Sequence, residues 1–162
     1  MHITKTMHKC PIPFWTYSRI AQHIAVEYPH RSLDFARSYS KNQMSAKSWL
    51  VERLSLSPAA KIKDKNIVVL GSWYGTLIVP LLRHYLNDIQ KIKLIDYDSD
   101  TLSIAKMMFH DIQTECVDVS FDLPSISADI VINTSCEHMW HMRDITIDGL
   151  CAFQSNDYTK ET

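Results

Sequence analysis

A glycine-bounded turn and two carboxylates are the residues best placed for chemistry in this sequence. Gly71 and Gly75 are two of only three glycines in 162 residues, and they bracket a turn that follows the apolar run 67–70. Asp96 and Asp118 each come at the end of a further strand-like run. Glycine allows positive φ or a close approach of a ligand to the backbone, and a carboxylate can accept both hydroxyls of a ribose. In this order these residues predict a pocket for an adenosine.

Glu137 and His138 are the titratable side chains nearest to the end of the fourth strand that the pattern predicts. His138 can act as a base near neutral pH, although a glutamate at a helix start and an exposed or buried histidine need no chemistry. Cys136 and His141 add two possible metal ligands, but their spacing fits no common zinc pattern. Cys136 and His138 would also point to different sides of a helix, so we predict no metal site.

The elements that must position these residues divide the chain into a helical part, 1–60, and an alternating part, 61–155. The expected helices lie at about 16–28, 32–40, 46–56, 76–87, 99–109 and 136–143. The expected strands are 67–70, 92–96, 115–119, 129–133 and 149–154, with a loop at 121–128. Such alternation is typical of a parallel sheet whose ligands bind at the carboxyl ends of the strands. The helical part is expected either to cover one side of the sheet or to gate a substrate.

Length and composition indicate one domain, 1–162, in a cytoplasmic protein. A formal net charge of −1 argues against a general basic field for nucleic acid. The four cysteines are widely spaced in a chain large enough to bury a core, which favours reduced thiols. Neither a signal-peptide h-region at 1–14 nor an apolar run of about 20 residues is present, so no membrane segment is expected.

Taken in order, the motifs resemble those of the class I S-adenosylmethionine-dependent methyltransferases over about residues 60–155. The family's first, second and fourth motifs are similar to 69–75, 94–106 and 129–135. The resemblance implies an α/β, Rossmann-like three-layer sandwich with strand order 3-2-1-4-5 and S-adenosyl-L-methionine as the cofactor. It places the ribose on Asp96 and the adenine near Asp118. The implied cofactor-binding residues are Gly71, Ser72, Trp73, Tyr74, Gly75, Asp96, Tyr97, Asp118, Val119 and Asn133.

The sequence departs from the family pattern in its first motif and at its C-terminus. Trp73 stands where the family has its middle glycine, and Val69 stands where an acidic residue is often found. A bulky Trp73 can stack beside the ligand or fill part of its place. The helix and final β-hairpin that usually follow the fifth strand have no counterpart here. We therefore expect a truncated version, a fragment, or a sheet completed by a second copy or a partner subunit.

The resemblance implies a methyltransferase in which alignment of the acceptor with the methyl group carries most of the catalysis, with Glu137 and His138 as candidate catalytic residues. The Asn/Asp/Ser-Pro-Pro-aromatic motif and the Pro-Cys pair of enzymes that methylate nucleic acid are both lacking. A small molecule or a protein side chain is thus the expected acceptor. A non-catalytic S-adenosylmethionine-binding protein remains the alternative. A nicotinamide dinucleotide fits less well, because its pyrophosphate needs glycine where Trp73 lies.

Overall fold

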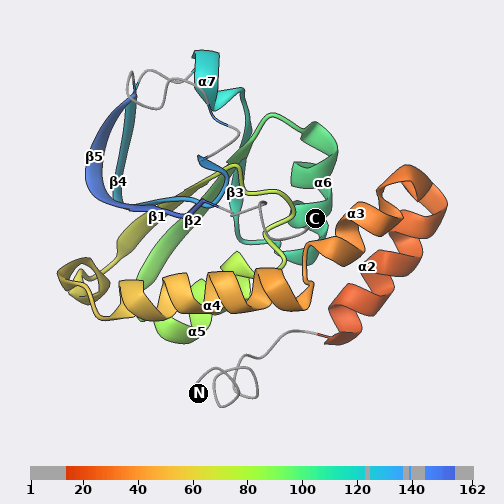
Figure 1. The fold of residues 1–162 in the computed structure, drawn as a ribbon, viewed down its shortest axis with the longest axis horizontal. Coiled ribbons are helices and arrows are strands. Elements are labelled where there is room, and N and C mark those ends of the chain that lie inside the picture. The colour runs from red at the N-terminus through yellow and green to blue at the C-terminus, as the bar shows by residue number, and fades with distance from the viewer. Residues whose placement is uncertain (1–13, 123–124, 137–138, 140–144, 156–162) are drawn as a thin grey trace.

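The protein forms an α/β fold around one parallel sheet (Figure 1). A computed structural model describes residues 14–122, 125–136, 139 and 145–155. The strands are β1 (Lys65–Leu70), β2 (Ile89–Asp96), β3 (Gln113–Cys116), β4 (Ser125–Asn133) and β5 (Thr146–Phe153). Their order is β3-β2-β1-β4-β5, and every neighbouring pair is parallel, which confirms the order 3-2-1-4-5.

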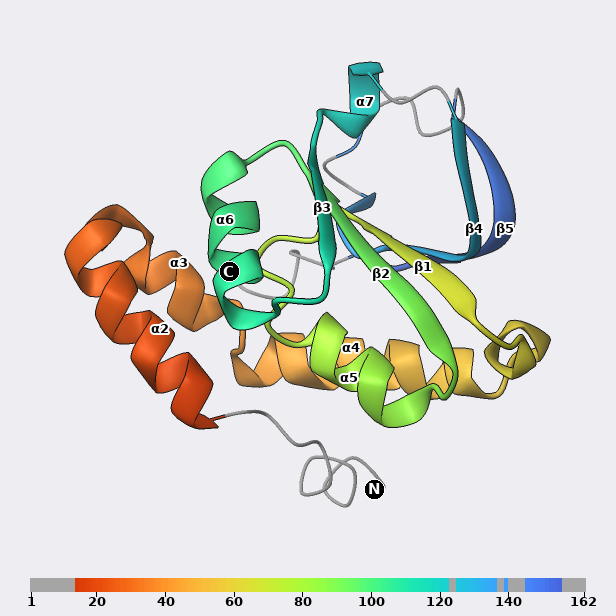
Figure 2. The same cartoon turned by 180° about the vertical axis from the view of Figure 1, so that it is seen from behind.

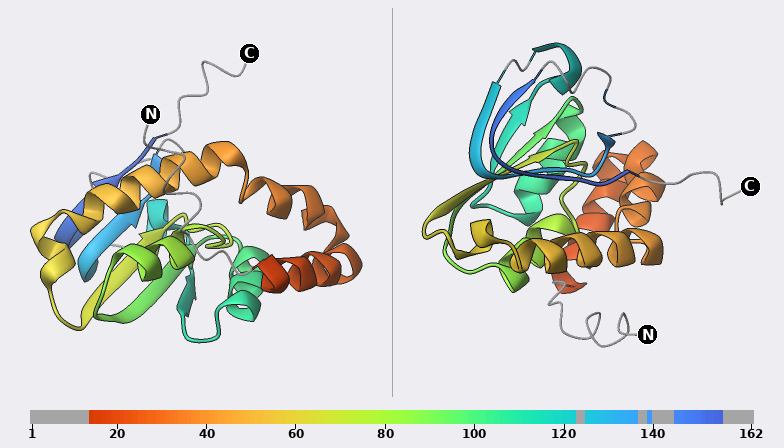
Figure 3. Two further views of the ribbon diagram at one scale, coloured as in Figure 1. Left: turned by 90° about the horizontal axis from the view of Figure 1, so that it is seen from below. Right: turned by 60° about the vertical axis from the view of Figure 1, so that its left-hand side comes forward.

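Helices precede the sheet and connect its strands. They are α2 (Phe14–Glu27), α3 (Ser32–Arg37), α4 (Lys41–Ser55), α5 (Ile78–Tyr85), α6 (Ser99–Met108) and α7 (Val119–Asp122), with 3-10 turns at η1 (Pro29–Arg31) and η2 (Pro58–Lys61). α4 runs beside α5, whereas α2 lies next to α6 (Figures 2 and 3). Within the described ranges, no helix is both long and apolar enough to cross a membrane.

Two apolar clusters bury the two faces of the sheet. The larger one joins alternate residues of β1, β2 and β4, including Ile67 and Val69, to α2, α3, α4, α5 and α6. The smaller one contains the residues that point the other way, such as Val68 and Leu70, together with Val119 of α7. Helices therefore lie on both faces, as expected for a Rossmann-like fold. The core is much deeper on the face that the N-terminal helices cover.

Several element boundaries differ from those that the apolar pattern predicted. β2 begins at Ile89 rather than 92, and β4 begins at Ser125 rather than 129. The first three residues of β2 are exposed or half-buried, and the first three of β4 alternate exposed and buried positions, so neither early half contains an apolar run. The loop expected at 121–128 is thus partly strand. β3 ends at Cys116, so the strand expected at 115–119 was placed too late, and α7 occupies the positions that follow.

Gly149 fits β5 against an irregularity in β4. The β4–β5 register shifts between Ser127 and Ile130, and Gly149 has a φ of 136°. A Cβ at this position would lie 1.8 Å from the Ala128 carbonyl oxygen, so only glycine allows the two backbones to approach. The neighbouring Asp129 accepts a hydrogen bond from the Asn66 amide at 2.7 Å, which joins the irregularity to β1.

Candidate cofactor cleft

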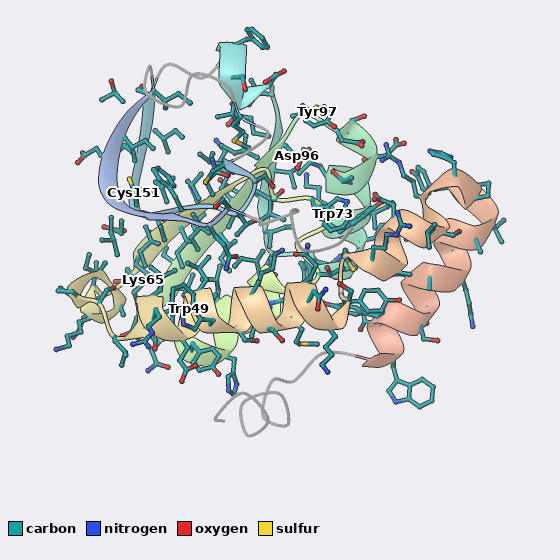
Figure 4. The ribbon with its side chains drawn as sticks, in the orientation of Figure 1. Trp49, Lys65, Trp73, Asp96, Tyr97 and Cys151 are labelled. Carbon is teal, nitrogen blue, oxygen red and sulfur yellow. The ribbon has the colours of Figure 1, made fainter. Side chains whose placement is uncertain are left out.

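A cleft of about 590 Å³ opens at the carboxyl ends of the strands, the position expected for the ligand of an open parallel sheet. Its wall combines the turn after β1, the loops after β2, β3 and β4, and side chains from α3 and α4. Seven of the predicted cofactor residues line it: Gly71, Ser72, Trp73, Asp96, Tyr97, Asp118 and Val119. Trp73, Asp96 and Tyr97 lie between the strand ends and α3 and α6, whereas Cys151 lies away on β5 (Figure 4).

The turn after β1 uses the left-handed backbone region three times. Gly71, Trp73 and Gly75 have φ values of 57°, 54° and 67°. Trp73 therefore adopts a left-handed backbone conformation that glycine takes readily, at a cost of about 1–2 kcal/mol for a residue with a side chain. Gly71 is needed for space as well. A Cβ there would lie 2.6 Å from Met139 Cε and 2.9 Å from Ser135 Cβ.

Asp96 connects the turn after β1 with the loop after β2. The Trp73 amide donates to Asp96 Oδ2 at 2.8 Å, and the Asp98 amide donates to Asp96 Oδ1 at 3.1 Å. Burial raises the pKa of Asp96, while these amide hydrogen bonds oppose that rise. Each carboxylate oxygen has a second lone pair, so Asp96 can still accept hydroxyl protons from a ligand.

Asp34 of α3 is a cleft residue that the sequence patterns did not reveal. Its Oδ2 accepts hydrogen bonds from Trp73 Nε1 at 2.9 Å and from the Tyr74 hydroxyl at 2.7 Å. Arg31, at the end of η1, lies 2.5 Å from Asp98 Oδ2 and 3.9 Å from Asp34 Oδ2. These partners are separated by 39 residues or more along the chain in all but one of the contacts, so no local spacing could have indicated them.

Other residues missing from the prediction complete the wall on the sides of α4, α6, α7 and the loops after β3 and β4. They are Gln43, Lys47, Thr101, Val117, Ser120, Phe121, Thr134, Ser135 and Met139. Lys47 donates a hydrogen bond to Gln43 on the preceding turn of α4. The amphipathic pattern of the N-terminal part predicted helices, but the polar residues of α4 that face the cleft looked like ordinary surface positions.

Three predicted cofactor residues lie behind the cleft wall. Tyr74 is completely buried, and its ring meets that of Phe35 edge-on at 5.3 Å. Gly75 faces the core, where a Cβ would lie 2.8 Å from Leu94 Cδ1. Asn133 is also fully buried, and its Oδ1 accepts a hydrogen bond from the Ser135 amide at 2.9 Å. These three residues shape the wall without forming its surface.

The candidate catalytic residues Glu137 and His138 lie outside the described residues, as does His141. Cys136 is half-buried, and its thiol donates to the Asn133 carbonyl oxygen at 3.3 Å. Among the residues that the structure describes, no group of three or more His, Cys, Asp and Glu side chains could hold a metal ion.

Comparison with known proteins identifies the fold. No protein-family model matches the sequence, and no curated protein matches it either. Solved methyltransferase structures do match the fold. They include the CurJ carbon methyltransferase, with 18% identity over 71% of this chain and a TM-score of 0.54. A TehB-like S-adenosylmethionine-dependent methyltransferase from Corynebacterium glutamicum has 14% identity over 82% and a TM-score of 0.52.

A third structure, assigned as an S-adenosylmethionine-dependent methyltransferase from Methanococcus maripaludis, has 16% identity over 81% of this chain and a TM-score of 0.54. This chain spans 34% of the CurJ chain, 65% of the Methanococcus protein and 72% of the Corynebacterium protein. The chain therefore has the Rossmann-like α/β fold of these methyltransferases.

Proposed function

We propose that the cleft binds S-adenosyl-L-methionine and that the protein is a methyltransferase. The observation that carries this proposal is the position of Asp96. It ends β2 inside the cleft, and its carboxylate is oriented by the amide of the turn after β1. A carboxylate so placed suits the two ribose hydroxyls of an adenosine. Because the fold resembles that of solved methyltransferases, we infer that the adenosine-containing ligand is S-adenosyl-L-methionine.

The proposed contacts follow the cleft wall. Asp96 holds the ribose, while Asp118 and Val119 after β3 face the adenine. Tyr97 is 76% exposed at the rim of the cleft, where its ring can cover the bound nucleoside. The backbone of the segment 71–73 lies against the rest of the cofactor. Tyr74, Gly75 and Asn133 support this wall from behind.

The charge of the cleft suits a cationic cofactor. Among the described residues, its wall contains four carboxylates, on Asp34, Asp96, Asp98 and Asp118, and two basic side chains, on Arg31 and Lys47. The sulfonium of S-adenosyl-L-methionine carries a positive charge that the product S-adenosylhomocysteine lacks. An excess of negative charge in a partly enclosed cleft therefore favours the substrate form over the product.

Methyl transfer would take place where the cleft meets the carboxyl end of β4. Thr134, Ser135 and Met139 line this part, and Glu137 and His138 belong to the same segment of the sequence. We propose the acceptor to be a small molecule or a protein side chain, with Glu137 or His138 as the base if the acceptor holds a proton.

We infer that the cleft has room for the cofactor because Trp73 leaves it open. The cleft has a volume of about 590 Å³ even though it contains the Trp73 side chain, whose indole N–H points to Asp34. This volume lies within the usual range for small-molecule sites. Trp73 therefore does not remove the space that a cofactor needs.

We also propose that the sheet is extended at β5 by a second copy or a partner subunit. In the described part of the chain, β5 pairs only with β4, and Leu150 and Phe153 on it are 37% and 53% exposed. A mass measurement in solution would test this: a purely monomeric protein at micromolar concentration would contradict assembly of two copies.

Titration calorimetry with S-adenosyl-L-methionine, S-adenosylhomocysteine and NAD tests the proposed function. We expect both sulfur compounds to bind, with the methionine form tighter, and NAD to show no heat of binding. The absence of binding by either sulfur compound at millimolar concentration would overturn the proposal. Turnover is then sought with a methyl-labelled cofactor and pools of small molecules and proteins, with Glu137→Gln and His138→Ala compared against the unchanged protein.

A further inference from the structure

Trp73 occupies a strained backbone conformation that only surrounding contacts can maintain. Its φ of 54° lies in the left-handed region, which a large side chain disfavours by about 1–2 kcal/mol relative to glycine. The conformation matters for the cleft, because it places the Trp73 amide 2.8 Å from Asp96 Oδ2. Whatever fixes Trp73 therefore also orients the carboxylate of Asp96.

Asp34 supplies the contacts that fix this turn. A single carboxylate oxygen, Oδ2, accepts from Trp73 Nε1 at 2.9 Å and from the Tyr74 hydroxyl at 2.7 Å. Hydrogen bonds to a charged acceptor are about twice as strong as neutral ones. Burial and the Asp34 hydrogen bond raise the pKa of Tyr74 well above its ordinary value, so the phenol remains a donor. Phe35, the next residue of α3, packs against the Tyr74 ring.

Arg31 links the N-terminal helices to the loop after β2. Its guanidinium lies 2.5 Å from Asp98 Oδ2 and 3.5 Å from Asp100 Oδ2 on the loop and helix after β2. Burial disfavours the charged form of Arg31, but the hydrogen bond and charge of Asp98 outweigh it, and the pKa of Arg31 lies above its ordinary value. The segment from Arg31 to Asp34 thus joins the turn after β1 to the loop after β2.

We propose that Asp34 is a positioning residue, which holds Trp73 in the left-handed conformation that glycine would adopt without help. This inference rests on the proposed function, since the turn is the one that would receive S-adenosyl-L-methionine. Asp34 acts through the Trp73 amide and the Asp96 carboxylate rather than through the reacting atoms. A turn with Trp73 in the place of glycine would then depend on α3 to keep its shape.

The decisive experiment compares Asp34→Ala in two backgrounds by calorimetry with S-adenosylhomocysteine. In the otherwise unchanged protein we expect the substitution to weaken binding by about tenfold, because it releases the strained residue. In the Trp73→Gly background the same substitution should weaken binding less than about twofold, since glycine needs no support at positive φ. Equal losses in both backgrounds would overturn the proposal.

Ser38→Ala is the matched control. The Ser38 hydroxyl lies 2.8 Å from Thr76 Oγ1, so this variant also removes a contact between the N-terminal part and the turn, but away from the cleft wall. It should lower the melting temperature and leave S-adenosylhomocysteine binding nearly unchanged. A loss of binding as large as that of Asp34→Ala would show that any loosening of the turn has the same effect, which contradicts a specific role for Asp34.

A measurement without the cofactor separates this inference from the proposed function. The indole N–H resonance of Trp73, identified by its loss in Trp73→Phe, should shift in Asp34→Asn and Asp34→Ala but remain in place in Ser38→Ala. An unchanged resonance would overturn the positioning role even if the cofactor binds. If the unchanged protein binds no S-adenosylhomocysteine, the proposed function fails, and the resonance alone decides whether Asp34 holds Trp73.

Discussion

The two walls of the cleft are held in different ways. The wall formed by the turn after β1 is bound to the N-terminal helices. The Tyr17 hydroxyl donates to the Thr76 carbonyl oxygen, and Asp34 accepts from both Trp73 and Tyr74. On the opposite wall, formed by the loops after β3 and β4, the carboxylate of Asp118 has a short-range partner. The Ser120 amide donates to Asp118 Oδ1 at 3.0 Å, only two residues away along the chain.

We infer from this difference that the two walls have different roles in ligand binding. Long-range contacts hold the turn after β1, which would contact the proposed cofactor, in place before the ligand binds. Less conformational entropy is then lost on binding. Among the described residues, Ser135 and Gly71 connect the walls directly, with the Ser135 hydroxyl donating to the Gly71 carbonyl oxygen at 3.3 Å.

Removing Asp96 should produce the largest effect on ligand binding. Asp96→Ala eliminates the proposed ribose acceptor and leaves the Trp73 amide without its carboxylate partner. We expect the affinity for S-adenosylhomocysteine to fall by about 1.5–3 kcal/mol, roughly 10- to 150-fold. Calorimetry measures this, with the exposed Asp148→Ala as a control for the loss of one charge. An unchanged affinity would reduce Asp96 to an ordinary loop carboxylate.

A smaller effect is expected where the walls meet. Gly71→Ala introduces a Cβ at positive φ and at 2.6 Å from Met139 Cε. The unfolding free energy should fall by about 1–2 kcal/mol from the backbone conformation alone, with a further loss from the contact. Urea unfolding measures both parts. Combining the change with Met139→Ala should recover only the part due to Met139, because the contact with Ser135 Cβ at 2.9 Å remains. A Gly71→Ala variant as stable as the original would disprove the close approach of the walls.

Asp118 on the opposite wall should matter less than Asp96. Its side chain is exposed and bound only to the neighbouring Ser120 amide in the structure, so water screens its interaction with a ligand. Asp118→Ala is expected to weaken S-adenosylhomocysteine binding by less than about 1 kcal/mol, or about fivefold. Calorimetry that gave a loss equal to that of Asp96→Ala would remove the proposed difference between the walls.

The smallest effect expected is a pH dependence from Asp96. Burial raises the pKa of this carboxyl in the folded state, so the folded protein binds its proton more tightly than the unfolded chain. The unfolding free energy should therefore decrease as pH rises above the ordinary carboxyl value of about 3.9. In Asp96→Asn this decrease should be absent. Urea titrations between about pH 4 and pH 7 compare the two slopes, and parallel slopes would contradict the raised pKa.

Features of the chain that depend on neighbouring residues were predictable. The helix expected at 99–109 is present as α6, which Asp98 caps by accepting from the Asp100 amide two residues away. The parallel sheet followed from apolar runs alternating with helical segments, because parallel strands need crossover connections, whereas the strand order was implied by the resemblance. The early halves of β2 and β4 were not predictable, since their exposed positions carry polar residues that resemble a loop.

The sequence by itself determined the parallel sheet and the positive φ of Gly71 and Gly75 in the turn after β1. Hydrophobic periodicity and backbone sterics act within a few residues, so local sequence is enough to predict them. Only the tertiary structure decided that Trp73 has a left-handed conformation and that Asp34, 39 positions earlier in the chain, is bound to it. It also separated the residues on the cleft surface from Tyr74, Gly75 and Asn133 behind it. Contacts of this range arise from packing of whole helices against the sheet, for which local sequence carries no signal.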